Sequence, residues 1–135
     1  MIPRDIHNMV TVINALNGAT IASDTTTDGA TIDLQNRHGV EFVLRASAYT
    51  DGTYTPVIEE SDTGAFSGEE NAVADADLIG TEANAAVSAA NTVGQVGYKG
   101  SKRYVRLTVV STSTTSGAHI SGTALVLPNV RGTTS

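Results

Sequence analysis

The chain has 135 residues, the length of a single domain, and contains no cysteine. Eight Lys and Arg stand against fourteen Asp and Glu, which gives a formal net charge of -6 at pH 7. The lack of cysteine excludes disulfide and thiol chemistry. The acidic balance argues against a general nucleic-acid binder, whose affinity depends on neutralising phosphates. Neither a signal-peptide pattern nor an apolar run of about 18 residues is present, so we expect no membrane partner.

The first quarter of the chain indicates an arm followed by short extended segments. Residues 1–8 offer little to bury and are expected to form the arm. Residues 9–16 are typical of a strand that ends at Asn17-Gly18, which is a strong hairpin signal. Residues 19–23 would then form the second strand of that hairpin, and a polar loop would follow.

Two further segments alternate between apolar and polar residues, at 30–35 and 40–47, as half-buried strands do. The second segment predicts an inward face of Val40, Phe42, Leu44 and Ala46, with Glu41, Arg45 and Ser47 outward and Val43 as an outward exception. Residues 53–60 read as another strand. Its Pro56 lacks an amide hydrogen and confines that strand to an edge or an irregular position.

Residues 61–97 form the least regular part of the sequence and hold a cluster of six acidic residues. They are rich in alanine and glycine and have no sustained apolar stripe. We expect an acidic excursion there with one or two weak strands and one helical turn near 70–78. The excursion includes Glu69 and Glu70.

The last third alternates again, over 102–112 and 117–127, and predicts a hairpin of two long strands. Val105, Leu107 and Val109 should face inward, and Tyr104, Arg106 and Thr108 outward. A flexible tail at 132–135 would complete a single domain over 9–131. About seven or eight strands with little helix favour an all-β antiparallel sandwich or jelly roll, and a partly open barrel is the alternative.

Half of the positive charge lies in one stretch, residues 98–110, which we call the basic segment. Its tyrosines could stack on single-stranded nucleic acid. The cations could instead form a solvated strand face with cross-strand partners such as Asp33 or Glu41. They could also meet an acidic patch, such as residues 59–82 of a neighbouring copy. The charges gather at one end of the strand, which favours a protein partner over nucleic acid. The predicted protein interface comprises Lys99, Lys102, Arg103, Tyr104, Arg106, Glu69 and Glu70.

No catalytic, cofactor or metal motif is complete. Asp24, Asp28 and Gly29 fit a calcium loop, but Thr26 and Gln35 stand where ligands are required. His7, His38 and His119 are too widely spaced to predict a zinc site. The glycine-rich stretches match neither a serine nucleophile turn nor a phosphate-binding loop. We therefore expect no enzyme and no cofactor.

Several phrases of the sequence, in order, resemble small virion proteins of tailed bacteriophages. They are "VEFVLRASAYTDGTYTPVIEESDTGAF", "ADLIGTEA" and "GYKGSKRYVRLTVV", and the most specific part starts at Gly100. The resemblance covers roughly residues 8–131. It implies a jelly-roll cement or decoration protein on the capsid surface of a virion, with the major capsid protein and its own copies as partners. The alternatives are a tail or neck component, or a glycan-binding sandwich that uses Tyr49 and Tyr54.

Overall fold

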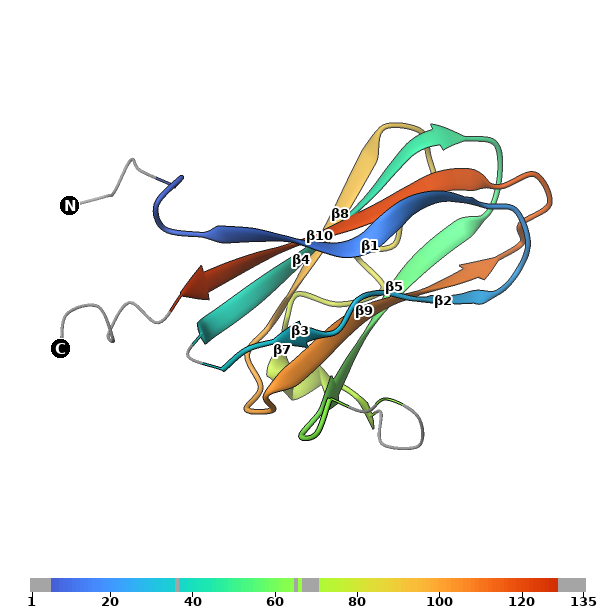
Figure 1. The fold of residues 1–135 in the computed structure, drawn as a ribbon. Coiled ribbons are helices and arrows are strands. Elements are labelled where there is room, and N and C mark those ends of the chain that lie inside the picture. Colours follow the sequence, from blue (N-terminus) through green and yellow to red (C-terminus); the bar gives the residue numbers. More distant parts are fainter. Residues whose placement is uncertain (1–5, 36, 65, 67–70, 129–135) are drawn as a thin grey trace, which may run out of the picture.

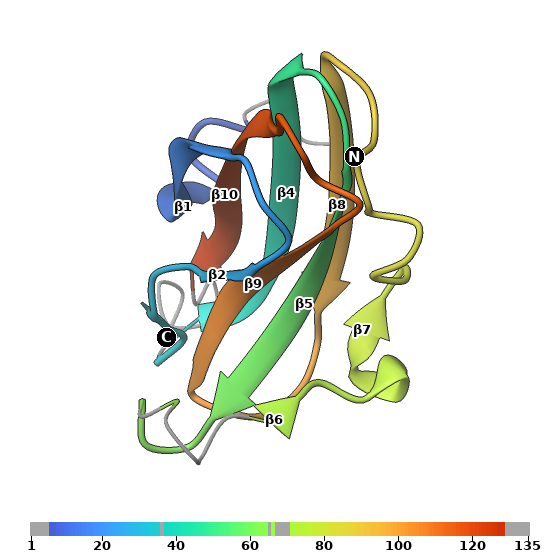
Figure 2. The ribbon, with the colours of Figure 1, turned by 90° about the vertical axis from the view of Figure 1, so that its right-hand side faces the viewer.

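The computed structural model describes residues 6–35, 37–64, 66 and 71–128, which form an antiparallel sandwich of two β-sheets (Figure 1). The first sheet has the order β1 (Thr11–Ile21), β10 (Ala118–Pro128), β4 (Arg37–Tyr49), β8 (Thr92–Tyr98) and β7 (Leu78–Ile79). The second has the order β2 (Thr26–Asp28), β9 (Tyr104–Thr112), β5 (Thr53–Ser61) and β6 (Asn71–Ala72), and β3 (Ile32–Asp33) also pairs with β9. Figure 2 shows the two layers from the side. The predicted all-β sandwich is confirmed.

The core lies between the sheets and is built by strands that alternate as predicted. All four residues expected inward on β4 are at most 5% exposed, and Val105, Leu107 and Val109 of β9 are fully buried. Val43 lies on the outer face of β4 and is half-buried, so it is the predicted exception. Burial of one apolar face per strand against the facing sheet is what holds the two layers together.

Pro56 lies at the outer edge of the second sheet, as its missing amide hydrogen predicts. The N–H of Tyr54 donates to the Val87 carbonyl and that of Ile58 to the Glu82 carboxylate, both on the side of β5 away from β9. Amide groups two residues apart point to the same side of a strand, so Pro56 faces the same outer edge. No ladder hydrogen bond to β9 is lost there.

The predicted hairpin at Asn17-Gly18 is wrong. The chain continues through these residues as one strand, β1, whose two halves both pair with β10. Register shifts between Asn14 and Leu16 and between Leu16 and Ala19 take up the additional residues. A β-bulge of this kind lets a strand pass through turn-forming residues without reversing.

The predicted hairpin of the last two long strands is also wrong, because β9 belongs to the second sheet and β10 to the first. The loop between them crosses the end of the sandwich. Asp51 closes that loop: its carboxylate accepts hydrogen bonds from the N–H groups of Thr115, Ser116 and Gly117. Strands that bury one face alternate in the same way whether they pair with each other or face each other across a core.

The acidic excursion is shorter than predicted. It contains β6, a single 3-10 turn at Asp75–Asp77 and β7, and the predicted helical turn is confirmed in this form. From Thr92 onward the chain is β8, a full strand paired along its length with β4. The expected one or two weak strands correspond to β6 and β7, but β8 was missed because glycines masked its alternation. A Cβ at Gly94 would overlap the carbonyl oxygen of Ala85, so only glycine allows residues 81–91 to pack on this strand.

Two boundaries also differ in the first quarter. The expected strand at 30–35 reduces to Ile32–Asp33, and the expected loop before it contains β2. Residues 1–5 of the predicted arm, the predicted tail at 132–135, and Glu69 and Glu70 lie outside the described residues.

Candidate interaction surface

Three of the four cations of the basic segment bind carboxylates of the same chain. Lys102 Nζ lies 2.7 Å from Asp62, Arg103 forms two hydrogen bonds of 2.9 Å with Asp33, and Arg106 Nε lies 2.6 Å from Glu59. The predicted cross-strand partner Asp33 is confirmed. Glu41 is wrong as a partner, because its carboxylate accepts a hydrogen bond from Gln95 instead, at 2.8 Å.

Arg106 is the centre of a network on the outer face of the second sheet. Its side chain is only 16% exposed, its second carboxylate neighbour is Asp28 at 3.6 Å, and its guanidinium stacks over the Phe66 ring at 4.5 Å. The Thr108 hydroxyl lies within hydrogen-bonding distance of both carboxylates, 3.3 Å from Asp28 and 2.9 Å from Glu59. Arg106 and Glu59 are both too enclosed to meet a partner, and removal of either would leave the other as a poorly solvated charge.

The pair between Arg103 and Asp33 is more open, because both side chains are 45% exposed. The hydrogen bonds from Arg103 lower the pKa of Asp33 to about 2, and the same contact raises the pKa of Arg103. The hydrogen bond that Lys102 donates to Asp62 likewise raises the pKa of Lys102. Exposed pairs of this kind contribute little to folding and leave their charges accessible.

Tyr98 ties the two sheets together at the start of the basic segment. Its ring is 2% exposed on β8, its hydroxyl donates to Glu60 on β5 at 2.8 Å, and it accepts the N–H of Lys102 at 3.0 Å. Burial and the carboxylate of Glu60 both raise the pKa of Tyr98, so the hydroxyl keeps its proton. A Cβ at Gly100 would clash with the tyrosine ring, which explains the glycine in this turn.

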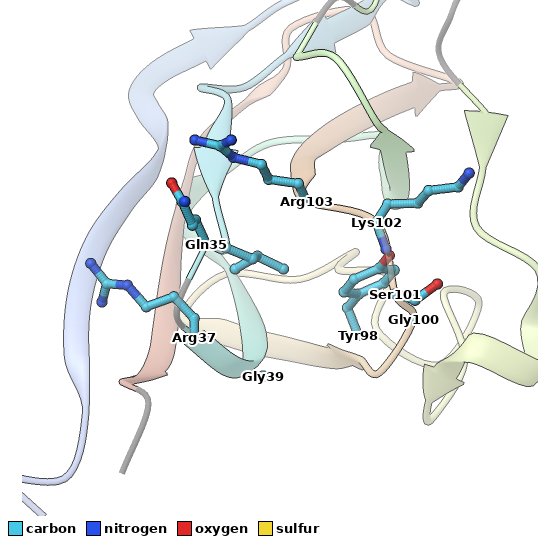
Figure 3. A pocket seen from close by; sticks show the side chains of 9 residues that line it. Gln35, Arg37, Gly39, Tyr98, Gly100, Ser101, Lys102 and Arg103 are labelled. Carbon is cyan, nitrogen blue, oxygen red and sulfur yellow. Dashed lines mark hydrogen bonds between the residues drawn. The ribbon is translucent and has the colours of Figure 1, made fainter. Parts of the chain in front are cut away.

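A cleft of about 380 Å³ opens beside this tyrosine at one end of the sandwich (Figure 3). Its lining residues are Leu34, Gln35, Arg37, Gly39, Tyr98, Gly100, Ser101, Lys102 and Arg103. In Figure 3 the side chains of the neighbouring residues Lys102 and Arg103 point in opposite directions. The cleft is therefore bordered by cations, but two of the three already bind Asp33 and Asp62.

The structure brings most of the predicted interface residues together around this turn. Tyr104 is half-buried and lies under the guanidinium of Arg103, 4.9 Å from its ring centre. Lys99 is exposed, and within the described residues it forms no ion pair. Contact of these residues with another subunit stays a prediction.

The first sheet carries a second feature, an apolar groove that sequence reasoning missed. It has a volume of about 400 Å³ and is lined by Val10, Gly39, Val40, Glu41, Ile79, Tyr98, Lys99, Leu125 and Leu127. Ile79 at its border is 58% exposed. The signal in the sequence was the outward position of Leu125 and Leu127 in the last strand, where polar residues are usual on a solvated face.

The tyrosine pair and the histidines that the sequence analysis considered as binding residues form no binding site among the described residues. Tyr54, offered as half of a glycan platform, is fully buried, so it cannot form one with Tyr49. The ring of His119 lies 3.3 Å from the Ser47 hydroxyl. Within the described part of the chain, no three His, Cys, Asp or Glu residues form a group that could hold a metal ion, and no helix is long and apolar enough to cross a membrane.

Comparison with known proteins gives the fold and no family. No protein-family model and no curated protein matches the sequence. A chain in the structure of the capsid of Ralstonia phage GP4 is 13% identical, over 88% of this chain and 84% of that chain, with a TM-score of 0.50. A chain of infectious bursal disease virus strain Gx is 15% identical, over 89% of this chain but only 32% of that chain, with a TM-score of 0.52. The chain thus has a sandwich fold that is also found in two virus particles.

Proposed function

We propose that the chain is a structural protein of a phage virion that binds the outside of the capsid as a cement or decoration protein and bridges major capsid protein subunits. The observation that carries this proposal is the likeness to a chain of the GP4 capsid structure, which extends over most of both chains. A match of this extent relates two chains of similar length. The virus Gx chain, by contrast, is about three times longer than the matched part.

The surface chemistry of the chain is compatible with this role. Three of the four cations of the basic segment are held in ion pairs with carboxylates of the same chain, and no metal-ligand cluster occurs in the described ranges. A shell component needs no chemistry of its own, because many weak contacts repeated by symmetry hold it in place. The open pair of Arg103 and Asp33 and the exposed Lys99 are the charged groups best placed for such contacts.

Quantitative mass spectrometry of purified virions tests the proposal. We expect the chain at many copies, in a fixed molar ratio to the major capsid protein. We also expect the purified chain to bind saturably to capsids that lack it and to raise the temperature at which they open. A few copies per particle would indicate the alternative, a tail or neck component. Absence from the virion would refute a structural role altogether.

A further inference from the structure

A row of side chains crosses all five strands on the outer face of the first sheet. The strand register places Val12 beside Leu125, Leu125 beside Glu41, Glu41 beside Gly97, and Gly97 beside Ile79. Residues in register point to the same face of a sheet. The two end members are well exposed, Val12 at 64% and Ile79 at 58%. The outer face thus presents apolar side chains on three of its five strands, with Glu41 between them, and exposed apolar side chains of this kind mark a contact site.

The apolar groove lies along this row and carries two charges of opposite sign. Glu41 stands in the row itself and receives a hydrogen bond from Gln95, yet it forms no ion pair with any described residue. Lys99 borders the same groove and also has no carboxylate partner among the residues that the structure describes. Its backbone is fixed, because its N–H donates to the Asp77 carbonyl at 2.8 Å. Every other cation of the basic segment is paired.

We propose that this face is the contact between two copies of the chain related by a two-fold axis, with Lys99 of each copy bound to Glu41 of the other. A two-fold contact uses the same patch on both copies, so the patch must be complementary to itself. This patch has that property: it combines apolar side chains with one anion, Glu41, within the row and one cation, Lys99, at the border of the groove, and neither is ion-paired among the described residues. The two reciprocal ion pairs would set the register of the two sheets.

The size of the patch sets the expected affinity. Five strands spaced about 4.8 Å apart span roughly 19 Å, and the apolar part extends over only a few residues along each strand. The area buried per copy is then well under the roughly 800 Å² of a standard interface. We expect a weak dimer, with a dissociation constant between about 1 µM and about 1 mM. The dimer can be tested with the purified chain alone, without capsids. A negative result would therefore leave the capsid proposal standing, and failure of the capsid proposal would leave the dimer standing.

The apolar part of the proposal is tested by sedimentation equilibrium of the purified chain at concentrations up to about 1 mM. We expect the native chain to pass from monomer to dimer, and Ile79→Asp to remain monomeric over the whole range. The matched control is Val93→Asp, because Val93 is equally exposed at 58% and lies on β8, outside the groove. It should dimerise like the native chain. A monomeric native chain, a trimer, or equal loss in both variants would overturn the proposal.

The proposed ion pairs are tested by reversing the charge of each partner and then mixing the two variants. Glu41→Lys places two lysines at each contact and Lys99→Glu two glutamates, so each variant alone should lose at least tenfold in affinity. An equimolar mixture should regain dimers, because both contacts of a mixed pair then join a lysine to a glutamate. Arg45→Glu, an exposed reversal on the same strand outside the groove, should dimerise normally. Circular dichroism establishes that each variant is folded, and a mixture that stays monomeric would refute the reciprocal pairing.

Discussion

Removal of a single oxygen atom tests how the end of the sandwich that carries the basic segment is held together. Tyr98→Phe keeps the buried ring and deletes the hydroxyl that joins Glu60 of β5 to the N–H of Lys102. A hydrogen bond to a charged group contributes about 1.5–3 kcal/mol, and a part-buried N–H left without a partner costs a further 1–3 kcal/mol or so. Because Glu60 can regain water, we expect a net loss of about 2–3 kcal/mol in the free energy of unfolding. At this chain length that corresponds to a melting temperature lower by roughly 6–15 °C.

The assay is urea unfolding followed by far-ultraviolet circular dichroism, which does not depend on tyrosine fluorescence. The control is Tyr104→Phe, because Tyr104 is half-buried and its hydroxyl forms no hydrogen bond with any described residue. That variant should stay within about 0.5 kcal/mol of the native chain. Equal losses in the two variants would show that the Tyr98 hydroxyl does not join the sheets, and the reasoning would be refuted.

Three other predictions concern packing and charge. Gly94→Ala should lower the free energy of unfolding by more than about 2 kcal/mol, because the added methyl group overlaps a backbone carbonyl. Gly39→Ala has open space around it and should change this free energy little. Equal melting temperatures of the two variants would contradict this. Arg106→Glu should lower the free energy of unfolding by more than about 2 kcal/mol, because it places a carboxylate beside that of Glu59, which is only 16% exposed. Arg103→Glu, at an exposed site, should destabilise the chain much less. Similar unfolding curves for the two variants would contradict this. The pKa of the Asp33 carboxyl should be about 2 in the folded chain and higher in Arg103→Gln, where the N–H of Gln35 still donates to this carboxylate. Since this pKa is lowered by folding, its contribution is complete above about pH 3.8 and is lost toward pH 2; an unchanged titration by NMR would contradict the pairing.

The alternating segments allowed much of the core to be predicted from sequence. The inward face of β4 and that of β9 follow from a period of two, which any strand with one buried face obeys. Pro56 could be placed at an edge because it lacks an amide hydrogen. These predictions depend only on the chemistry of each strand by itself.

Pairing between strands could not be predicted, because it depends on which elements meet across the core. The alternation of β9 and β10 is the same for a hairpin as for strands in opposite sheets, and only the fold separates the two. β8 was missed because Gly94 occupies an inward position, beside Leu44, where an apolar side chain would have revealed the alternation. The glycines of β8 are needed for close approach by Ala85 and by Glu41 and Ile79, contacts that no local pattern reveals.

For the predicted interface residues too, local patterns could be predicted from the sequence and contacts between distant segments could not. Clustering of cations in the basic segment was visible in the sequence, and one partner, Asp33, was predicted. That Arg106 is enclosed while Lys99 is open follows from the position of Phe66 and the carboxylates around it. The apolar groove needed the register of four strand pairs before its members came together.

The central claim, a structural place on the outside of a capsid, is tested most directly by a cryo-electron microscopy map of the intact virion. We predict density for this sandwich on the outer surface, repeated with the symmetry of the shell and in contact with more than one major capsid protein subunit. Density confined to the tail or neck, or a shell surface without this sandwich, would contradict it.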